Sequence, residues 1–506
     1  MDFDNDLRSI QEARDLVARA KIAAAQYAAC DQAQADRFAE AVARACASEA
    51  ARLAKMAVEE TGYGNARDKT LKNILGSSVT WDYIKNMKTL GVLREDRDSG
   101  VTEIGVGVGV IVALIPSTNP TSTTMYKALI ALKSGNAVVF SPHPGARGCI
   151  EATVRVIREA LGSAGAPANL VDCVGTPTEA GADALLRHRG VGLILATGGE
   201  AMVRAAYSSG NPALGVGAGN APAYIEKSAD VAAAARRIVE SKTFDNGTIC
   251  ASEQSIVTER GIEDKVLDEL VAQGAYMLNA QESARLAAVL RRPNGSMNPQ
   301  MVGKTAAECA RLAGISAPDG VSVLVSRQTD AAPDNPYARE KLCPVLAFYV
   351  RDGWQSACEL CIDLLANEGA GHTMAIHSEN ESVIREFAMK KPVSRLLVNT
   401  PAALGGVGAT TGLAPAFTLG CGAAGGSATS DNLTPLHLIN IRRLARHNEA
   451  VAESRLRRRA LREDIQEAGI FATARGQAAD FGARREFSRD DVEAIAWEVL
   501  RRMGRQ

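Results

Sequence analysis

IGVGVGVIVALI, residues 104–115, is rich in β-branched residues and glycine and is followed directly by Pro116. Such a stretch predicts a buried strand. The next segments alternate between helical apolar spacing, at 121–134 and 149–161, and short apolar runs typical of strands, at 137–140, 170–174 and 191–196. This alternation indicates an open parallel sheet with helices on both faces, and because it resumes over residues 222–420 the predicted fold class is α/β.

Gly105, Gly107 and Gly109 form a G-x-G-x-G pattern inside this predicted strand. A dinucleotide-binding fingerprint follows a strand and does not lie within one, so the pattern fails that context. We interpret the three glycines as positions where strands pack closely.

The length and charge of the chain limit the classes of protein to consider. A chain of 506 residues is too long for one ordinary core, so we expect two or three domains. Its 57 basic and 58 acidic side chains nearly cancel, which gives no reason to expect a nucleic acid partner. We find no leader pattern and no apolar run long enough to span a bilayer, so we expect a cytoplasmic protein without a membrane partner. Residues 6–60 are alanine-rich and predict consecutive helices.

The sequence around one pair of cysteines and around one single cysteine indicates how these thiols are used. Cys358 and Cys361 form a lone C-x-x-C with helical flanks, which favours two thiols one helical turn apart over a metal or redox site, and no metal site is predicted. Cys250 follows a Gly-Thr turn in FDNGTICASE, residues 244–253. Its small polar neighbours can hold a nucleophilic thiol exposed on a loop, although a single cysteine is more often a small buried side chain.

Asn119 and two glycine-containing loops are further candidates. Asn119 follows the strand that ends near Ile115, where its amide can donate to a developing oxyanion or, alternatively, cap a helix at an Asn-Pro turn. The turn at 197–199 can present N–H groups to a phosphate or ribose, or be a plain strand–helix turn. The loop at 215–222 has little side-chain bulk, so a flat ligand can lie against it, or it is a flexible connector.

Together these stretches resemble the CoA-acylating branch of the aldehyde dehydrogenase superfamily, over about residues 5–450. That branch includes half of the bifunctional aldehyde–alcohol dehydrogenases and the aldehyde dehydrogenases of bacterial microcompartments. Further matching stretches lie at 60–65, 116–126, 140–144, 206–210, 243–254 and 340–346. The resemblance implies a homodimer or homotetramer. It also implies a Rossmann-type cofactor domain over residues 1–225, an α/β catalytic domain over 226–420, and a small β oligomerisation arm from 96–104 and a return segment at 421–450.

The resemblance also implies roles for individual residues. Cys250 would attack the aldehyde and carry a thioester, and Asn119 with the Cys250 N–H would hold the oxyanion. Glu340 matches the residue that binds the nicotinamide ribose. The implied cofactor site consists of Pro116, Ser117, Thr118, Ser141, His143, Pro144, Thr197, Gly198, Gly199, Gly217, Gly219 and Glu340.

One departure from the family pattern predicts the reaction type. Val216-Gly-Ala-Gly219 stands where hydrolytic relatives carry Glu-Leu-Gly-Gly, whose glutamate activates the water that cleaves the thioester. Valine cannot act as a base, so deacylation by water loses its catalyst. The sequence therefore predicts a reversible, CoA-acylating aldehyde dehydrogenase that transfers hydride to NAD(P) and an acyl group to coenzyme A.

The choice of cofactor and aldehyde stays open. NAD is expected, with NADP as the alternative, because Pro144 replaces a glutamate of NAD-preferring relatives and His143 and Arg147 can accept a 2′-phosphate. The residues flanking Cys250 and the run at 416–419 favour a short aliphatic aldehyde. Sulfoacetaldehyde, oxidised with NADP, is the alternative.

The C-terminal segment carries a separate prediction. Residues 451–487 predict a linker, and 488–506 an amphipathic helix whose apolar face includes Val492, Ile495 and Val499. Such a helix resembles the peptides that recruit enzymes to bacterial microcompartment shells, and the alternative is a helix that packs on the enzyme itself. A catalytically silent scaffold protein of a microcompartment is the more remote alternative for the whole chain.

Overall fold

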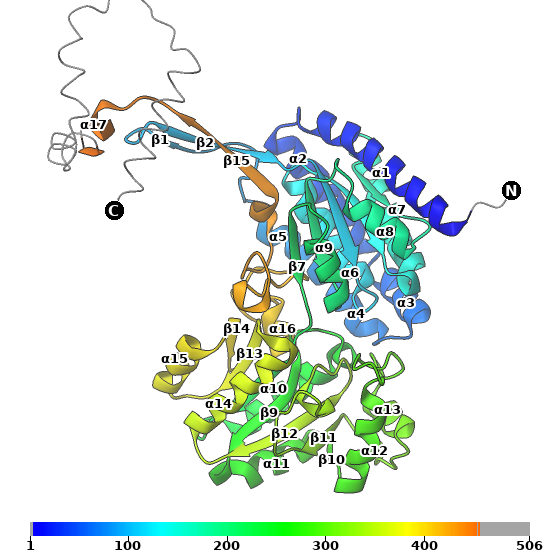
Figure 1. Cartoon of the computed structure of the whole chain (residues 1–506), viewed down its shortest axis with the longest axis vertical. Coiled ribbons are helices and arrows are strands. Elements are labelled where there is room, and N and C mark those ends of the chain that lie inside the picture. Colours follow the sequence, from blue (N-terminus) through cyan, green and yellow to red (C-terminus); the bar gives the residue numbers. More distant parts are fainter. Residues whose placement is uncertain (1–3, 453, 456–506) are drawn as a thin grey trace, which may run out of the picture. The chain divides into compact units, whose positions relative to one another are not determined.

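The computed structural model describes residues 4–452 and 454–455 (Figure 1). The amphipathic helix predicted at 488–506 and most of the linker predicted at 451–487 lie outside the described residues. The chain divides into two compact units, one of Met1–Leu93 with Ile104–Arg442 and one of Arg94–Glu103 with Arg443–Gln506. Every site residue predicted above belongs to the larger unit.

The N-terminal segment is helical, as its alanine-rich pattern predicted. The helices are α1 (Asn5–Tyr27), α2 (Gln32–Ser48), α3 (Ala50–Thr61), α4 (Ala66–Ile74) and α5 (Thr80–Ile84), with a π-helical turn between the last two. Asp31 begins α2 with a capping box, in which its side chain accepts from the Gln34 N–H and the Gln34 side chain accepts from the Asp31 N–H. Asn65 caps α4 by accepting from the N–H of Asp68.

The first large sheet has five parallel strands in the order β5-β4-β3-β6-β7. The strands are β3 (Val110–Ile115), β4 (Ala137–Pro142), β5 (Val171–Cys173), β6 (Leu193–Thr197) and β7 (Ala213–Val216). The helices that follow them are α6 (Pro120–Lys133), α7 (Arg147–Ser163), α8 (Glu179–Leu186) and α9 (Glu200–Tyr207). The predicted alternation of parallel strands and helices is confirmed, and the fold is α/β.

The single strand predicted over residues 104–115 is wrong, because two strands share that stretch. β2 (Val101–Gly107) ends before β3 begins, and Gly109 between them has φ 105°, a conformation that breaks a strand. Gly105 and Gly107 do pack closely, but their nearest neighbours are carbonyl oxygens of a loop and a turn and not of neighbouring strands as predicted. A Cβ at Gly105 would lie 2.2 Å from the Thr89 carbonyl oxygen, and one at Gly107 2.5 Å from that of Gly135.

The second large sheet has seven parallel strands in the order β10-β11-β12-β9-β8-β13-β14. The strands are β8 (Ala221–Ile225), β9 (Glu253–Glu259), β10 (Ala275–Met277), β11 (Val323–Arg327), β12 (Val345–Arg351), β13 (Gly371–His377) and β14 (Val393–Val398). The helices are α10 (Val231–Thr243), α11 (Glu263–Ala272), α12 (Ala280–Leu290), α13 (Ala306–Leu312), α14 (Trp354–Leu364), α15 (Glu381–Lys390) and α16 (Ala402–Gly406). Cys358 and Cys361 are buried in α14, which confirms their interpretation as helix residues.

A third, small sheet has the order β1-β2-β15, with β1 (Gly91–Asp96) and β15 (Ile439–Ala445) on either side of β2. It combines the two segments from which the oligomerisation arm was predicted, and that role stays a prediction. A short helix, α17 (Glu449–Ala452), follows β15.

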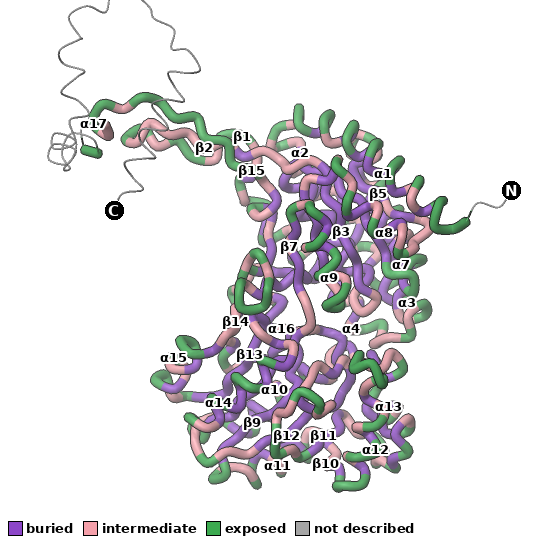
Figure 2. The backbone as a smooth tube through the Cα atoms, in the orientation of Figure 1, coloured by how far each residue is buried: buried purple, intermediate pink, exposed green. Residues whose placement is uncertain are grey.

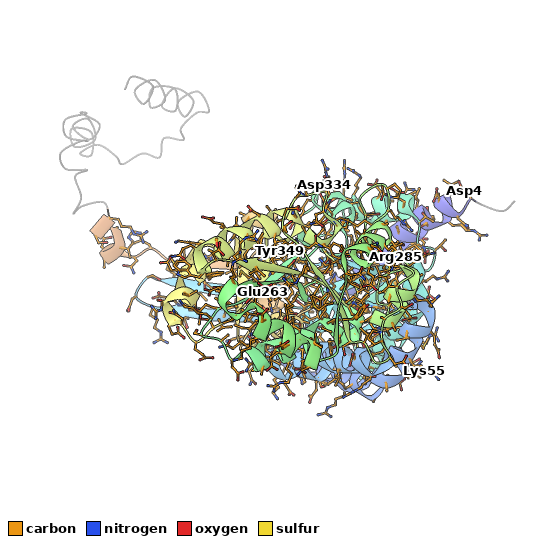
Figure 3. The ribbon with its side chains drawn as sticks, turned by 90° about the horizontal axis from the view of Figure 1, so that it is seen from below. Asp4, Lys55, Glu263, Arg285, Asp334 and Tyr349 are labelled. Carbon is orange, nitrogen blue, oxygen red and sulfur yellow. The ribbon has the colours of Figure 1, made fainter. Side chains whose placement is uncertain are left out.

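Burial follows the two large sheets. Every residue of β3, β4 and β13 is buried, whereas β1 and β15 are mostly exposed (Figure 2). Charged side chains such as Lys55, Arg285 and Asp334 lie at the surface (Figure 3). Within the described residues, no helix is both long and apolar enough to cross a membrane.

Candidate active site

A pocket of about 250 Å³ collects most of the predicted site residues. Its walls include Pro116, Ser117, Thr118, Asn119, His143, Thr197, Gly198, Gly199, Val216, Gly217, Cys250 and Glu340. These residues come from the carboxyl ends of β3, β4, β6 and β7, and from loops that precede strands of the seven-stranded sheet. Three predicted residues, Ser141, Pro144 and Gly219, are not among those that line the pocket.

Cys250 has a histidine partner that the sequence reasoning missed. His372, the second residue of β13, places its Nε2 3.2 Å from the Cys250 Sγ. Its Nδ1 lies 2.9 Å from the Thr373 Oγ1, which also accepts from the Arg395 Nε at 3.3 Å. An Nδ1–H that donates to Thr373 leaves Nε2 as an acceptor for the thiol proton. No spacing motif links residue 372 to residue 250, so only the fold brings them together.

The resting pair is neutral on both sides. Burial, together with the nearby Arg395 guanidinium, lowers the pKa of His372 to about 3. Burial raises the pKa of the Cys250 thiol to about 12, and the Glu340 carboxylate acts in the same direction. The site therefore holds a thiol beside an uncharged imidazole, and the thiol becomes a thiolate only if its proton is transferred.

Asn119 is positioned as an amide donor and not as a helix cap. It stands at the N-cap position of α6, but its side chain makes no capping hydrogen bond. Instead, its Nδ2 donates to the Thr248 carbonyl oxygen at 3.1 Å and to the Thr118 Oγ1 at 3.2 Å. Its Oδ1 accepts from the Lys72 Nζ at 2.7 Å. The alternative of a capping side chain is thereby excluded.

Glu340 is the one carboxylate among the described residues that line the pocket. Its Oε1 accepts from the Gly219 N–H at 2.9 Å. Burial raises the pKa of Glu340 to about 7, and the neighbouring Glu368 adds to the increase. Glu340 therefore changes its charge near neutral pH.

Gly219 is required by packing around Cys250. A Cβ at this position would lie 2.0 Å from the Cys250 carbonyl oxygen and 3.3 Å from the His372 ring. By contrast, a Cβ at Gly217 or Gly199 would meet nothing within 4 Å. The loop at 215–222 therefore packs tightly against the Cys250 backbone at Gly219. At Gly217 the same loop lines the pocket, and no atom lies close enough to meet a Cβ there.

This geometry places a cysteine thiol beside a histidine at the carboxyl edge of a parallel α/β sheet, where ligands bind in such folds. The model of the aldehyde dehydrogenase family matches residues 7–413. The chain belongs to the aldehyde dehydrogenase family.

Individual relatives are similar along most of this chain. The bifunctional aldehyde-alcohol dehydrogenase AdhE of Escherichia coli is 41% identical over 446 residues, which cover 87% of this chain and 50% of that protein. An acetylating aldehyde dehydrogenase from Geobacillus thermoglucosidasius has a solved structure with a TM-score of 0.87 and 47% identity, covering 88% of this chain and 98% of that one. A propionaldehyde dehydrogenase from Rhodopseudomonas palustris, solved with bound CoA and an acylated cysteine, has a TM-score of 0.78 and 28% identity, covering 86% of this chain and 97% of that one. The chain spans about half the length of the first curated relatives that it matches.

Proposed function

We propose that this chain oxidises a short aldehyde to its acyl-CoA thioester in a reversible reaction, with hydride transfer to NAD(P) and a thioester on Cys250. The observation that carries the proposal is the Cys250–His372 pair at a pocket where Val216 lines the wall at the position that a water-activating glutamate has in hydrolytic relatives. The acylated cysteine and bound CoA of the Rhodopseudomonas palustris enzyme support the same chemistry.

The residues around Cys250 can carry out the first half of this reaction. As Sγ forms a bond to the aldehyde carbon, its proton passes to the His372 Nε2, 3.2 Å away. The carbonyl oxygen becomes negatively charged, and one N–H of Asn119 exchanges the Thr118 Oγ1 for this oxyanion. A bound nicotinamide cofactor supplies the hydride acceptor that converts this adduct to a thioester.

The second half requires a nucleophile to release the acyl group. Val216 cannot activate water, and Glu340 is engaged with the Gly219 N–H. The CoA thiol attacks the thioester carbon, a new C–S bond forms and the bond to Sγ breaks. Between the two halves, His372 releases to solvent the proton that it took from Cys250. It can then accept the proton of the CoA thiol and pass it to the departing Cys250 thiolate, which restores the resting pair.

The residues at the end of β6 fit a dinucleotide. Thr197 and Gly198 lead into Gly199, which begins α9 without a side-chain cap, so the first N–H groups of the helix can face a phosphate. We propose NAD over NADP, because the Arg147 Nε donates to Glu151 at 2.7 Å and the His143 Nδ1 accepts from the Gly145 N–H at 3.1 Å. Both candidates for a 2′-phosphate contact are thus engaged within the chain.

The pocket favours a short aliphatic aldehyde over sulfoacetaldehyde. Its lining near Cys250 includes Ile249, Val407, Phe417 and Leu419, and among the described residues no lysine or arginine lines it. A sulfonate would need such a cation to replace its hydration. Of the residues predicted to lie beside the aldehyde, Ala251, Ala416 and Thr418 are buried and are not among those that line the pocket.

Turnover with short aldehydes is expected to depend on CoA. Acetaldehyde, propionaldehyde, butyraldehyde and sulfoacetaldehyde are compared with NAD and NADP, with and without CoA, while reduced cofactor and acyl-CoA are quantified together. We expect equal amounts of the two products, preference for NAD, and in the absence of CoA a single burst of about one reduced cofactor per Cys250. Continuous turnover to a free carboxylate without CoA contradicts the proposal.

Cofactor binding is expected to strengthen between pH 6 and pH 8 through Glu340. With its pKa raised to about 7, this carboxyl is protonated at pH 6 and ionised at pH 8, and only the ionised form accepts from two ribose hydroxyls. The Kd for NAD, followed by protein fluorescence, should fall several-fold over this range. Glu340→Gln should bind more weakly and show no such change, and a wild-type Kd that is constant with pH contradicts the ribose role.

Three further assignments rest on the sequence and are proposals. They are the three-domain division, the homodimer or homotetramer assembled through the small sheet, and recruitment of the enzyme to a microcompartment shell by residues 488–506. Removal of residues 465–506 separates the last from a structural role, because a targeting helix can be lost without loss of activity.

A further inference from the structure

A buried ion cluster lies directly beneath the loop that carries Asn119. Asp245, in the turn that follows α10, accepts from two lysines of α4 through the same oxygen, Oδ2: from Lys69 at 2.9 Å and from Lys72 at 2.5 Å. All three side chains are at most 2% exposed. Three charges withdrawn from water are costly to bury unless each is fully hydrogen-bonded, so such a cluster calls for a specific role.

Lys72 connects this cluster to two residues on the wall of the pocket. Besides Asp245, its Nζ donates to the Asn119 Oδ1 at 2.7 Å and to the Thr248 Oγ1 at 3.0 Å. The three donors of the ammonium group are thus all used, each by a different acceptor. Lys69 lies one turn earlier on α4 and pairs with the same carboxylate, but its remaining contact is the Thr118 carbonyl oxygen at 2.9 Å.

The contact with Lys72 determines which way the Asn119 amide faces. An ammonium group only donates, so the oxygen of the amide has to face Lys72 and the nitrogen has to face the other side. The Thr248 carbonyl oxygen completes the arrangement, because it accepts from the Asn119 Nδ2. Without the ammonium, a half-turn of the amide would place its oxygen where an oxyanion has to be bound.

The cluster itself is held by a second layer of contacts. Asp245 and the next residue, Asn246, have φ 48° and 53°, in the left-handed region. The Asp245 Oδ1 accepts from the Asn65 N–H at 2.8 Å, and the Asp245 N–H donates to the Asp68 Oδ2 at 2.7 Å. A Cβ at Gly64 would lie 1.8 Å from the Asp245 Oδ1, so only glycine leaves room for the carboxylate. Residues 60–65, one of the stretches that resemble the family, thus include two positions, Gly64 and Asn65, that hold the Asp245 carboxylate.

We propose that Lys72 is a positioning residue, which holds the Asn119 amide in the one orientation that presents an N–H to the oxyanion formed on the Cys250 adduct. The proposal rests on the proposed function, because it takes Asn119 as the oxyanion donor. Lys72 touches no substrate, and it acts through Asn119 alone. Asp245 and Thr248 hold the ammonium in place, and the second layer of contacts holds Asp245.

The test is a double-mutant cycle on the full chain with Lys72→Met and Asn119→Ala. Removal of an oxyanion donor typically lowers kcat by about 10²- to 10³-fold, so a misoriented one is expected to cost about 10- to 100-fold. Lys72→Met should lower kcat to this extent with little change in the KM for NAD. In the Asn119→Ala background, the same substitution should have almost no further effect on kcat, because the group through which Lys72 acts is already gone.

Two other lysines provide controls. Lys69→Met removes the other half of the ion cluster at equal burial, and should lower stability comparably but kcat much less. Lys133→Met removes a buried lysine that pairs with Asp36 at 2.5 Å, away from the site, and should leave kcat unchanged. Stability is measured by urea unfolding, and if Lys72→Met does not fold, Lys72→Ala, which also removes the donor, replaces it in the cycle.

The rate to follow is the burst of reduced cofactor in the absence of CoA, so a failure of acyl transfer to CoA does not affect the outcome. Equal loss of this rate from the Lys72 substitution in both backgrounds overturns the positioning role. A burst that Asn119→Ala leaves unchanged overturns both the oxyanion assignment and the role of Lys72. Continuous turnover without CoA overturns the CoA-acylating function. The Lys72 result can still be interpreted in that case, because the first reduction of cofactor depends on the Cys250 adduct and not on CoA.

Discussion

Cys250→Ser is expected to lower kcat by at least about 10⁴-fold, the scale seen when a nucleophile of a catalytic pair is removed. Serine keeps the size and the polar contact with His372, but its hydroxyl is far less acidic than a thiol. Because the pKa of the buried imidazole is lowered to about 3, it is a weak base, and the attack has to rely on the greater acidity and nucleophilicity of the sulfur. The measurement is the steady-state rate together with mass spectrometry of the enzyme mixed with aldehyde and NAD, in which only the wild type should gain the mass of one acyl group.

Cys421 offers a matched control for this substitution. It is buried and lies close enough to Cys250 to raise the pKa of that thiol, but it does not line the pocket. Cys421→Ser should keep kcat within a few-fold of the wild type and still form the acyl adduct. An acyl group found on a cysteine other than Cys250, or a Cys250→Ser enzyme with ordinary turnover, contradicts the assignment of the nucleophile.

His372→Gln is expected to lower kcat by about 10²- to 10⁴-fold, the usual contribution of a general base. Glutamine fills similar space but cannot accept the proton from Sγ, so the burst of reduced cofactor should slow as much as the steady-state rate. The direction of the pKa shift adds a second signature. Because burial and Arg395 hold the pKa of His372 near 3, the imidazole is neutral from pH 5 to pH 8, and the wild-type rate should show no loss near pH 6.5 from its protonation.

His377 is the control that separates chemistry from packing. It ends the same strand, β13, is also fully buried, and has its pKa lowered to about 4 by burial. No contact with Cys250 involves it, so His377→Gln should alter stability without a change in the burst rate. Equal losses of the burst rate in the two variants would show that His372 serves packing and not proton transfer.

The sequence predicted the parallel α/β fold because its signals are local. Strands such as Ala137–Pro142 are short apolar runs, and helices such as α7 have continuous apolar spacing, so each can be recognised without its neighbours. The break at Gly109 could not be predicted, since a glycine in a strand pattern indicates close packing as readily as a left-handed turn.

The chemistry of the site divides along the same line. Cys250, Asn119 and Val216 were recognisable because each lies in a short stretch with its own pattern. The absence of a carboxylate at Val216 already predicted that a thiol, and not activated water, releases the acyl group. His372 and Lys72 carry no such pattern. They lie 122 and 47 residues away from the groups they contact, Cys250 and Asn119. Only the pairing of strands and the packing of α4 beneath the pocket decide these contacts, because a hydrogen bond depends on distance in space and not on spacing along the chain.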